Sequence, residues 1–162
     1  MKASVIREYN KIGMDEVRKP VLLGNHVLIK VIYSSICGSD QHIFKGEFHP
    51  RTKLPLIPGH EFAGVVEAVD KSVKTFKPGD KVTVDPIIWC GTCAACKAGH
   101  YPACTTLKLI GIDLDGGFGE YVSVPVHMVY KIPDHISDEY AQKGFDLLEN
   151  EPAKHLKILL KV

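Results

Sequence analysis

The chain has 162 residues, enough for one domain with a single hydrophobic core. Apolar residues make up 45% of it, charged residues 24%, and the formal net charge is +1 with Lys and Arg dispersed, which argues against a nucleic-acid partner. No apolar run reaches the length of a membrane span and no signal-peptide pattern follows Met1, so we expect a cytoplasmic protein with no membrane partner.

Short β-branched runs separated by Gly and Pro predict a mainly β domain. The expected strands, in chain order, cover Lys2 to Arg7, His26 to Tyr33, Gly64 to Val69, Lys81 to Asp85, Glu120 to Val124 and Met128 to Ile132. Only two helices are expected, a short turn after Ser39 and a longer helix from an N-cap at Ser137 through Leu148. After Pro152, apolar residues that alternate with lysines predict a last half-buried strand ending at Val162. Many short strands with few helices indicate a barrel-like β fold.

Four of the five cysteines crowd into one short segment, as Cys90-Gly-Thr-Cys93-Ala-Ala-Cys96 followed by Cys104. In a reducing compartment, clustered thiols hold metal more often than they form disulfides. Four thiolates satisfy a tetrahedral Zn²⁺ completely, so the segment predicts a structural zinc lobe. Free thiols or disulfides are the alternatives, and the spacing differs from the usual iron–sulfur motifs.

Two further segments, Cys37-Gly-Ser39-Asp-Gln-His42 and Gly59-His60-Glu61, suggest a second metal site. Taken singly they are weak signals, because a lone Cys is usually a small buried hydrophobe. Together, Cys37, His60 and Glu61 offer a thiolate, an imidazole and a carboxylate, the kind of ligand set that leaves a catalytic zinc with one exchangeable position. Ser39 would then accept the proton of a bound hydroxyl, and His42 would relay it to solvent.

The same segments, in order, resemble the zinc-dependent medium-chain alcohol and polyol dehydrogenases. The matching stretches run from about Lys2 to Ala141 and are "SSICGSDQHIF", "IPGHEFAGVVEAV", "FKPGDKVTVDP", "CGTCAACKAGHYPAC" and "GIDLDGGFGEYVSVP". The resemblance implies a GroES-like catalytic domain, a partly open β-barrel with a zinc-binding lobe. It also implies a small-molecule alcohol or polyol as substrate.

The resemblance further implies roles for single residues. Cys37 and His60 stand at the family's catalytic zinc positions, with Glu61 as the acidic residue beside the metal. Ser39 stands where the family has the hydroxyl that hydrogen-bonds the substrate, and His42 stands at the end of the proton relay. The structural zinc of the family would be held here by Cys90, Cys93, Cys96 and Cys104.

Within the family, "VDP" before the lobe and "GIDLDGGF" after it look most like the bacterial polyol and threonine dehydrogenases. Threonine enzymes of this branch carry a His three residues before the first lobe cysteine. This chain has Ile87 at that position, which favours a polyol or sugar alcohol as the parent substrate.

The family binds NAD or NADP on a Rossmann domain, whose fingerprint is a G-x-G-x-x-G turn between a strand and a helix. None of the fourteen glycines forms that pattern; Gly117 and Gly119 come nearest, but position 122 is Val. A second domain of about 150 residues would not fit in this length. The sequence therefore predicts no Rossmann fold and no dinucleotide site.

The stretch "ISDEYA", which in the family leads towards the Rossmann strands, is followed here by "QKGFDLLEN" and later by "LKILLKV". The last two resemble the far C-terminus of the family, where the chain returns to the catalytic domain. We therefore expect residues 1–141 to form the GroES-like domain and residues 142–162 to return a helix and strand to it. The clean join between Ala141 and Gln142 favours deliberate removal of the cofactor domain.

Three functions are compatible with these features. The first is the parent oxidation of a secondary alcohol, for which we expect no appreciable NAD(P)-dependent turnover because hydride-acceptor positioning is lost. The second is weak hydrolysis or hydration by a zinc-bound water at the exposed open site. The third is a purely structural zinc scaffold. Apolar surface exposed by the missing domain would also favour a homodimer.

Overall fold

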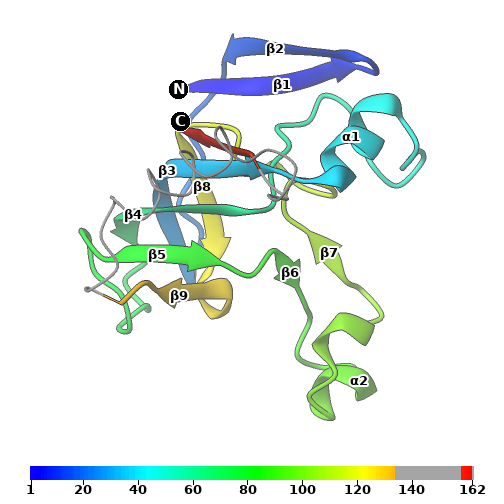
Figure 1. Cartoon of the computed structure of the whole chain (residues 1–162). Coiled ribbons are helices and arrows are strands. Elements are labelled where there is room, and N and C mark those ends of the chain that lie inside the picture. The colour runs from blue at the N-terminus through cyan, green and yellow to red at the C-terminus, as the bar shows by residue number, and fades with distance from the viewer. Residues whose placement is uncertain (134–157, 162) are drawn as a thin grey trace.

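The computed structural model describes residues 1–133 and 158–161 (Figure 1). The strands are β1 (Lys2–Glu8), β2 (Lys11–Glu16), β3 (His26–Ile36), β4 (Phe62–Val69), β5 (Lys81–Val84), β6 (Ile87–Ile88), β7 (Lys108–Leu109), β8 (Tyr121–Pro125), β9 (Val129–Lys131) and β10 (Ile158–Lys161). The helices are α1 (Gly38–Lys45) and α2 (Ala94–Lys97), with 3₁₀ turns η1 (Tyr101–Ala103) and η2 (Val126–Met128). The predicted mainly β fold with few short helices is confirmed.

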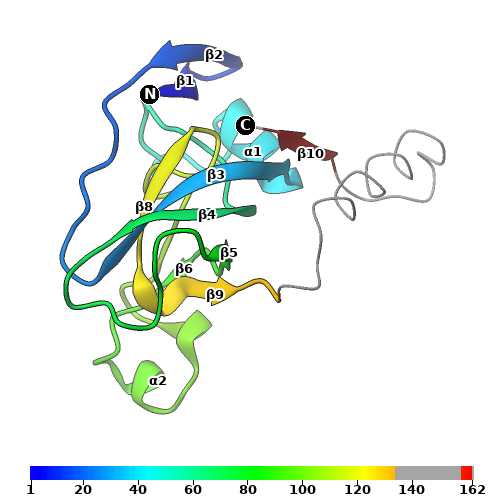
Figure 2. The same cartoon turned by 90° about the vertical axis from the view of Figure 1, so that its left-hand side faces the viewer.

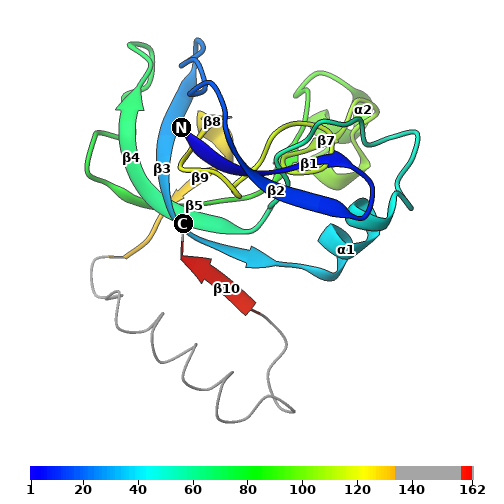
Figure 3. The same cartoon turned by 90° about the horizontal axis from the view of Figure 1, so that it is seen from above.

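Strand β3 is the centre of the main sheet, whose order is β10-β3-β4-β5-β9. One side of β3 pairs with β4, while its other side is shared by β8, opposite His26 to Lys30, and β10, opposite Tyr33 to Ile36. All of these pairs are antiparallel. Among the described residues, β9 at one end of the sheet pairs with neither β8 nor β10, so the sheet curls without closing (Figure 3). The predicted partly open barrel is therefore confirmed.

The main core lies inside this curled sheet and follows from side-chain alternation along its strands. Val27, Ile29 and Val31 of β3 are at most 2% exposed and pack with apolar side chains of β4, β5 and β8. Gly64 of β4 is required by the close approach of these strands, because a Cβ there would lie 2.1 Å from the carbonyl oxygen of Lys30. The register of β3 with β4, the strands next to the candidate metal ligands, is therefore fixed.

The cysteine-rich segment forms a lobe that projects from the sheet at the end opposite the β1–β2 hairpin (Figures 1 and 2). The short β6–β7 ribbon leads into it, and α2 and η1 form its body. Trp89, the last residue before the first lobe cysteine, stacks on Tyr101 with ring centroids 4.2 Å apart. The same indole lies 4.4 Å from the ring of His127 in η2, so it joins the lobe to the sheet.

Most sequence-predicted elements match the structure within a few residues. The elements that were not predicted are β2, whose residues are almost all exposed and show no apolar alternation, and several short elements: the β6–β7 ribbon, the single turn α2 inside the lobe and the turns η1 and η2. The predicted strand after Pro152 is present as β10. The predicted helix from Ser137 to Leu148 and the boundary at residue 141 lie outside the described residues. No helix among the described residues is both long and apolar enough to cross a membrane.

Candidate metal centres

The first candidate centre forms where β3 ends and β4 begins. Cys37 follows β3 directly and is the N-cap of α1, while Glu61 precedes β4. Ser34 pairs in register with Phe62, and the backbone N–H of Ser35 donates to the Glu61 carbonyl oxygen at 2.8 Å. Pairing of β3 with β4 therefore brings together residues that are more than twenty positions apart in the sequence. We call this cluster the open centre: Cys37, His60 and Glu61.

The donor atoms of the open centre suit a zinc ion. One donor atom from each of the three residues lies within 4.8 Å of the other two. The hydroxyl of Ser35 hydrogen-bonds a carboxylate oxygen of Glu61 and orients that side chain. A thiolate, an imidazole and a carboxylate are ligands that zinc accepts, and three protein ligands leave a fourth position open. The residues present thus fit a catalytic type of zinc site.

Asp40 was missed by sequence reasoning, although it is the residue that orients His60. The Oδ1 atom of Asp40 lies 3.4 Å from Nδ1 of His60, and both side chains are buried. Neither of these two atoms has a hydrogen-bond partner among the described residues, so the pair is an electrostatic contact. The Asp40 carboxylate raises the pKa of His60 to about 9, against burial, with a smaller contribution from Cys37. A metal-ligating histidine usually has such a carboxylate on its other nitrogen.

The other ring nitrogen of His60 faces Ser39. Its Nε2 atom lies 3.1 Å from the hydroxyl oxygen of Ser39. Hydrogen bonds from the side chain and backbone of Ser39, and then from His60, lower the pKa of Cys37. The Cys37 backbone N–H donates to Asp40 at 2.7 Å, which closes a capping box at the start of α1. The signal for Asp40 was therefore in the sequence, as an acidic residue three positions after the N-cap.

His42 lies on α1 one turn after Ser39, so both side chains point to neighbouring parts of the helix surface. The structure does not join them directly; His42 Nδ1 contacts a carboxylate oxygen of Glu47. Its ring also stacks on Phe48, with centroids 6.1 Å apart. The side chain of His42 is 53% exposed, so it is in contact with bulk water. Glu47 was not predicted, and its pKa is lowered by His42.

The second candidate centre consists of the four lobe cysteines, which we call the closed centre: Cys90, Cys93, Cys96 and Cys104. Their sulfurs all lie within 4.8 Å of one another. The Sγ atom of Cys90 is 3.6 Å from that of Cys104 and 4.0 Å from that of Cys96. A tetrahedron of zinc–sulfur bonds of about 2.3 Å has sulfur–sulfur edges of about 3.8 Å. All five cysteines are free thiols, so the spacing fits a zinc ion rather than disulfides.

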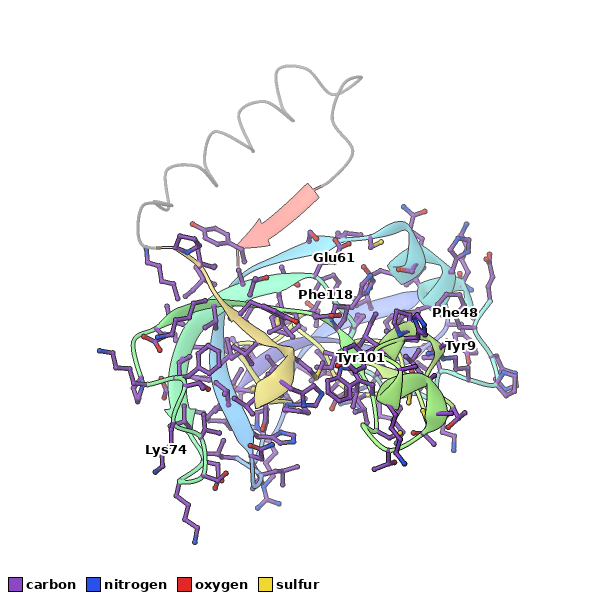
Figure 4. All side chains as sticks on the ribbon, turned by 90° about the horizontal axis from the view of Figure 1, so that it is seen from below. Tyr9, Phe48, Glu61, Lys74, Tyr101 and Phe118 are labelled. Carbon is purple, nitrogen blue, oxygen red and sulfur yellow. The ribbon has the colours of Figure 1, made fainter. Side chains whose placement is uncertain are left out.

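Local hydrogen bonds prepare the closed centre for a metal. The hydroxyl and backbone N–H of Thr92 and the backbone N–H of Cys93 each donate to Cys90 Sγ at 3.4 Å. These donors lower the pKa of Cys90, with Thr92 contributing most. Burial raises the pKa of Cys96, so without a cation the four thiols would not all ionise. Figure 4 shows Tyr101 on the lobe and Glu61 on the sheet, so the two centres occupy different parts of the molecule.

Comparisons with known proteins agree with this arrangement. A family model described as the alcohol dehydrogenase GroES-like domain matches residues 24–134. Starvation-sensing protein RspB of Escherichia coli K12 is 41% identical over 141 residues, which are 87% of this chain and 41% of that protein. L-threonine 3-dehydrogenase of Pyrococcus furiosus is 44% identical over 128 residues, covering 78% of this chain and 37% of the enzyme.

A solved structure with the same fold is galactitol-1-phosphate dehydrogenase from Escherichia coli. The two structures superpose with a TM-score of 0.80 and are 32% identical in sequence. The match covers 86% of this chain and 40% of the dehydrogenase chain. The chain thus spans about two fifths of the length of the curated relatives it matches. Both a threonine enzyme and a polyol-phosphate enzyme are among the similar proteins, so similarity alone does not separate the two substrate classes.

Proposed function

The chain belongs to the alcohol dehydrogenase GroES-like domain family, and on that premise we propose that it is the zinc-binding catalytic domain of a polyol or secondary-alcohol dehydrogenase and that these 162 residues do not themselves bind NAD(P). The observation that carries the proposal is the open centre, where Cys37, His60 and Glu61 converge beside the Ser39 hydroxyl. Ile87, in the position where threonine enzymes carry a histidine, favours a polyol over threonine.

At the open centre, a bound zinc ion would supply a Lewis acid that polarises an alcohol oxygen. Asp40 holds His60 so that Nε2 faces the side where Ser39 lies. The Ser39 hydroxyl lies 3.1 Å from that nitrogen, and once Nε2 ligates the metal the hydroxyl would be free to accept a hydrogen bond from an alcohol bound there. The Ser35 hydroxyl keeps the Glu61 carboxylate turned towards the centre.

His42 provides the exit for the proton. It stands one helical turn beyond Ser39 and is half exposed, with the Glu47 carboxylate against Nδ1. Because the Glu47 carboxylate contacts Nδ1, the other ring nitrogen of His42 is the one left to exchange a proton with water. Because no direct contact joins Ser39 to His42, the transfer between them requires a bridging substrate hydroxyl or water.

The same chain is not equipped to hold the hydride acceptor. Its sequence contains no dinucleotide fingerprint, and the described part of the main sheet is wholly antiparallel. Strand β10 pairs with β3, which supports the interpretation that the C-terminal residues return to this domain. Positioning of the two reactants is worth up to roughly 7–11 kcal/mol of the barrier. We therefore expect no appreciable oxidation of polyols with NAD or NADP by these 162 residues.

Two assays test the proposal together. With cobalt in place of zinc, addition of a polyol is expected to change the visible spectrum of the open centre, and Ser39→Ala should weaken that response. The zinc-loaded protein is expected to form no NADH or NADPH from the same polyols. Robust NADH or NADPH formation would refute the absence of a dinucleotide site in these 162 residues, and an unresponsive cobalt spectrum would refute the alcohol site.

A second candidate function is hydrolysis or hydration by a metal-bound water, favoured by the partly exposed Cys37 and a ligand set with a vacant fourth position. Water is not excluded from such a surface, so the rate would be modest. Hydrolysis of an activated ester should then require the open centre. Hydrolysis that persists in Cys37→Ala would have to come from another part of the protein. If the metal has only a structural role, neither the cobalt spectrum nor the ester assay should respond.

Self-association is the remaining part of the proposal. Apolar side chains that are more than half exposed include Met14, Val21 and Leu23 in the N-terminal region and Tyr130 on β9. Such side chains favour a homodimer when they gather on one face. Sedimentation at several protein concentrations should show a concentration-dependent dimer, and a constant monomer mass would contradict it.

A further inference from the structure

A cavity of about 410 Å³ lies away from both metal centres, and no residue of either centre lines it. Its walls come from β1, the segment 17–20 that follows β2, the segments 55–57 and 114–116, and β8. We call it the strap cavity, after the extended segment 17–20 that forms part of its wall. Its size lies within the range of small-molecule sites, roughly 300–1,000 Å³.

The interior of the strap cavity is apolar and rigid. Val5, Leu56, Ile57 and Val122 line it, and each is 4 or 5% exposed. The wall at Ile57 is fixed on both sides, because its N–H donates to Asp115 at 3.0 Å and its carbonyl oxygen accepts from the Gly116 N–H at 2.7 Å. A preformed apolar wall of this kind suits the aliphatic or aromatic part of a ligand.

Among the described residues, two cations at the cavity lack a carboxylate partner: the Met1 ammonium, which donates to the Val17 carbonyl oxygen at 2.7 Å, and Arg18. Arg7 is paired with Asp15 at 2.8 Å, and the Asp115 carboxylate already accepts the Ile57 N–H. Arg18, which is exposed, has no hydrogen-bond or ion-pair partner among the described residues. A free guanidinium beside an apolar interior favours a ligand with one anionic end.

From these observations we propose that the strap cavity binds a small organic acid, with its anionic group at Arg18 and its apolar body against Val5, Ile57 and Val122. The proposal does not depend on the metal chemistry at the open centre. The site does share a segment with that centre, since Ile57 lies three residues before His60. Ligand binding would therefore be felt at His60 through a short, hydrogen-bonded stretch of backbone.

The test is an NMR titration of the zinc-loaded full chain with 4-phenylbutyrate, with the neutral 4-phenylbutan-1-ol and inorganic phosphate as comparisons. We expect saturable shifts at Val5, Ile57 and Val122 with the acid. Affinity for the alcohol should be about tenfold lower, because a charge-assisted hydrogen bond is lost. Phosphate alone should give no saturable shift, because it lacks the apolar body; saturation by phosphate at these residues would overturn the assignment of an amphipathic ligand.

Three variants sharpen the titration. Arg18→Gln should weaken the acid about tenfold and leave the alcohol unchanged. Lys74→Gln is the matched control, since it removes the same charge from an exposed loop outside the cavity (Figure 4). Leu114→Trp, at a 42% exposed position on the wall, should fill the cavity and abolish binding of both compounds.

The proposal is overturned if 4-phenylbutyrate gives no saturable shift, or if Arg18→Gln binds it as tightly as the unchanged chain does. It is equally overturned if the shifts centre on Cys37, His60 and Glu61, because the carboxylate would then be bound at the metal. Unchanged binding in Leu114→Trp would place the ligand elsewhere.

Discussion

The closed and open centres use similar ligand chemistry but are assembled in different ways. The four sulfurs of the closed centre come from one short segment, and its donors to Cys90 are only two or three residues away. The open centre instead joins Cys37 to His60 and Glu61 across the pairing of β3 with β4. The first needs only local chain geometry, whereas the second needs the folded sheet.

Because the two centres are assembled differently, we expect them to respond differently to loss of their metal. A site made from one segment is folded largely by its metal, as in other small zinc modules. A site held by a sheet keeps its shape without the metal but binds it through fewer ligands. We therefore expect tight, structure-forming zinc at the closed centre and weaker, exchangeable zinc at the open one.

The largest expected effect is that of Cys93→Ser. Structural zinc in small modules contributes about 10–16 kcal/mol of binding free energy at neutral pH, so loss of one thiolate should release the lobe metal. NMR signals from residues 90–104 should collapse while those of β3 and β4 remain. Cys37→Ser is the control and should leave the lobe ordered. An ordered lobe in Cys93→Ser would show that zinc does not fold it.

A smaller effect is expected for Asp40→Asn, which keeps the shape of the side chain and removes its charge. Without that charge His60 is held less firmly, and metal affinity at the open centre should fall about 10–100-fold. Competition with a chromophoric chelator measures this affinity. Asp113→Asn, which removes the same charge and breaks an ion pair with Arg51 instead, is the control. Equal losses at the open centre in both variants would contradict the role of Asp40.

The pH dependence at the open centre follows from His60. Its pKa is about 9, so a metal must displace a proton at neutral pH, and affinity should rise by up to about tenfold per pH unit until pH 9. In the metal-free chain the sign is opposite: protonated His60 stabilises the fold below its ordinary pKa, and this is lost as pH rises through about 9. A pH-independent affinity between pH 7 and 9 would contradict the pKa of His60.

The smallest effect is expected for Trp89→Ala, which removes the rings' contact between lobe and sheet. Aromatic pairs contribute about 0.5–1.5 kcal/mol each, so the melting temperature should fall by a few degrees while the lobe keeps its zinc. Tyr130→Ala, at an exposed position, should change little. Zinc loss in Trp89→Ala would mean that the lobe is not self-contained.

Much of this structure follows from the sequence, and the exceptions have physical causes. Apolar alternation predicted β3, and the spacing of Cys90, Cys93 and Cys96 predicted a compact thiol cluster. Strand β2 was not predicted, because almost all of its side chains face solvent and show no alternation of buried and exposed positions. The role of Asp40 was not predicted, because its contact with His60 exists only after α1 and the start of β4 are brought together.

The strap cavity could not have been predicted, since its walls come from five segments with no shared motif. Its only local signal is Arg18, an unremarkable charge in a linker. The roles of Ser39 and His42 rest on family resemblance, and the structure adds that His42 is exposed and contacts Glu47.

Metal content distinguishes a chain with one closed and one open zinc centre from a chain with the closed centre alone. Elemental analysis of the purified chain and of Cys37→Ser, after exhaustive dialysis in zinc-containing buffer and removal of loose metal, should give two zinc ions and one, respectively. A value of one for both proteins would show that the open centre does not hold zinc.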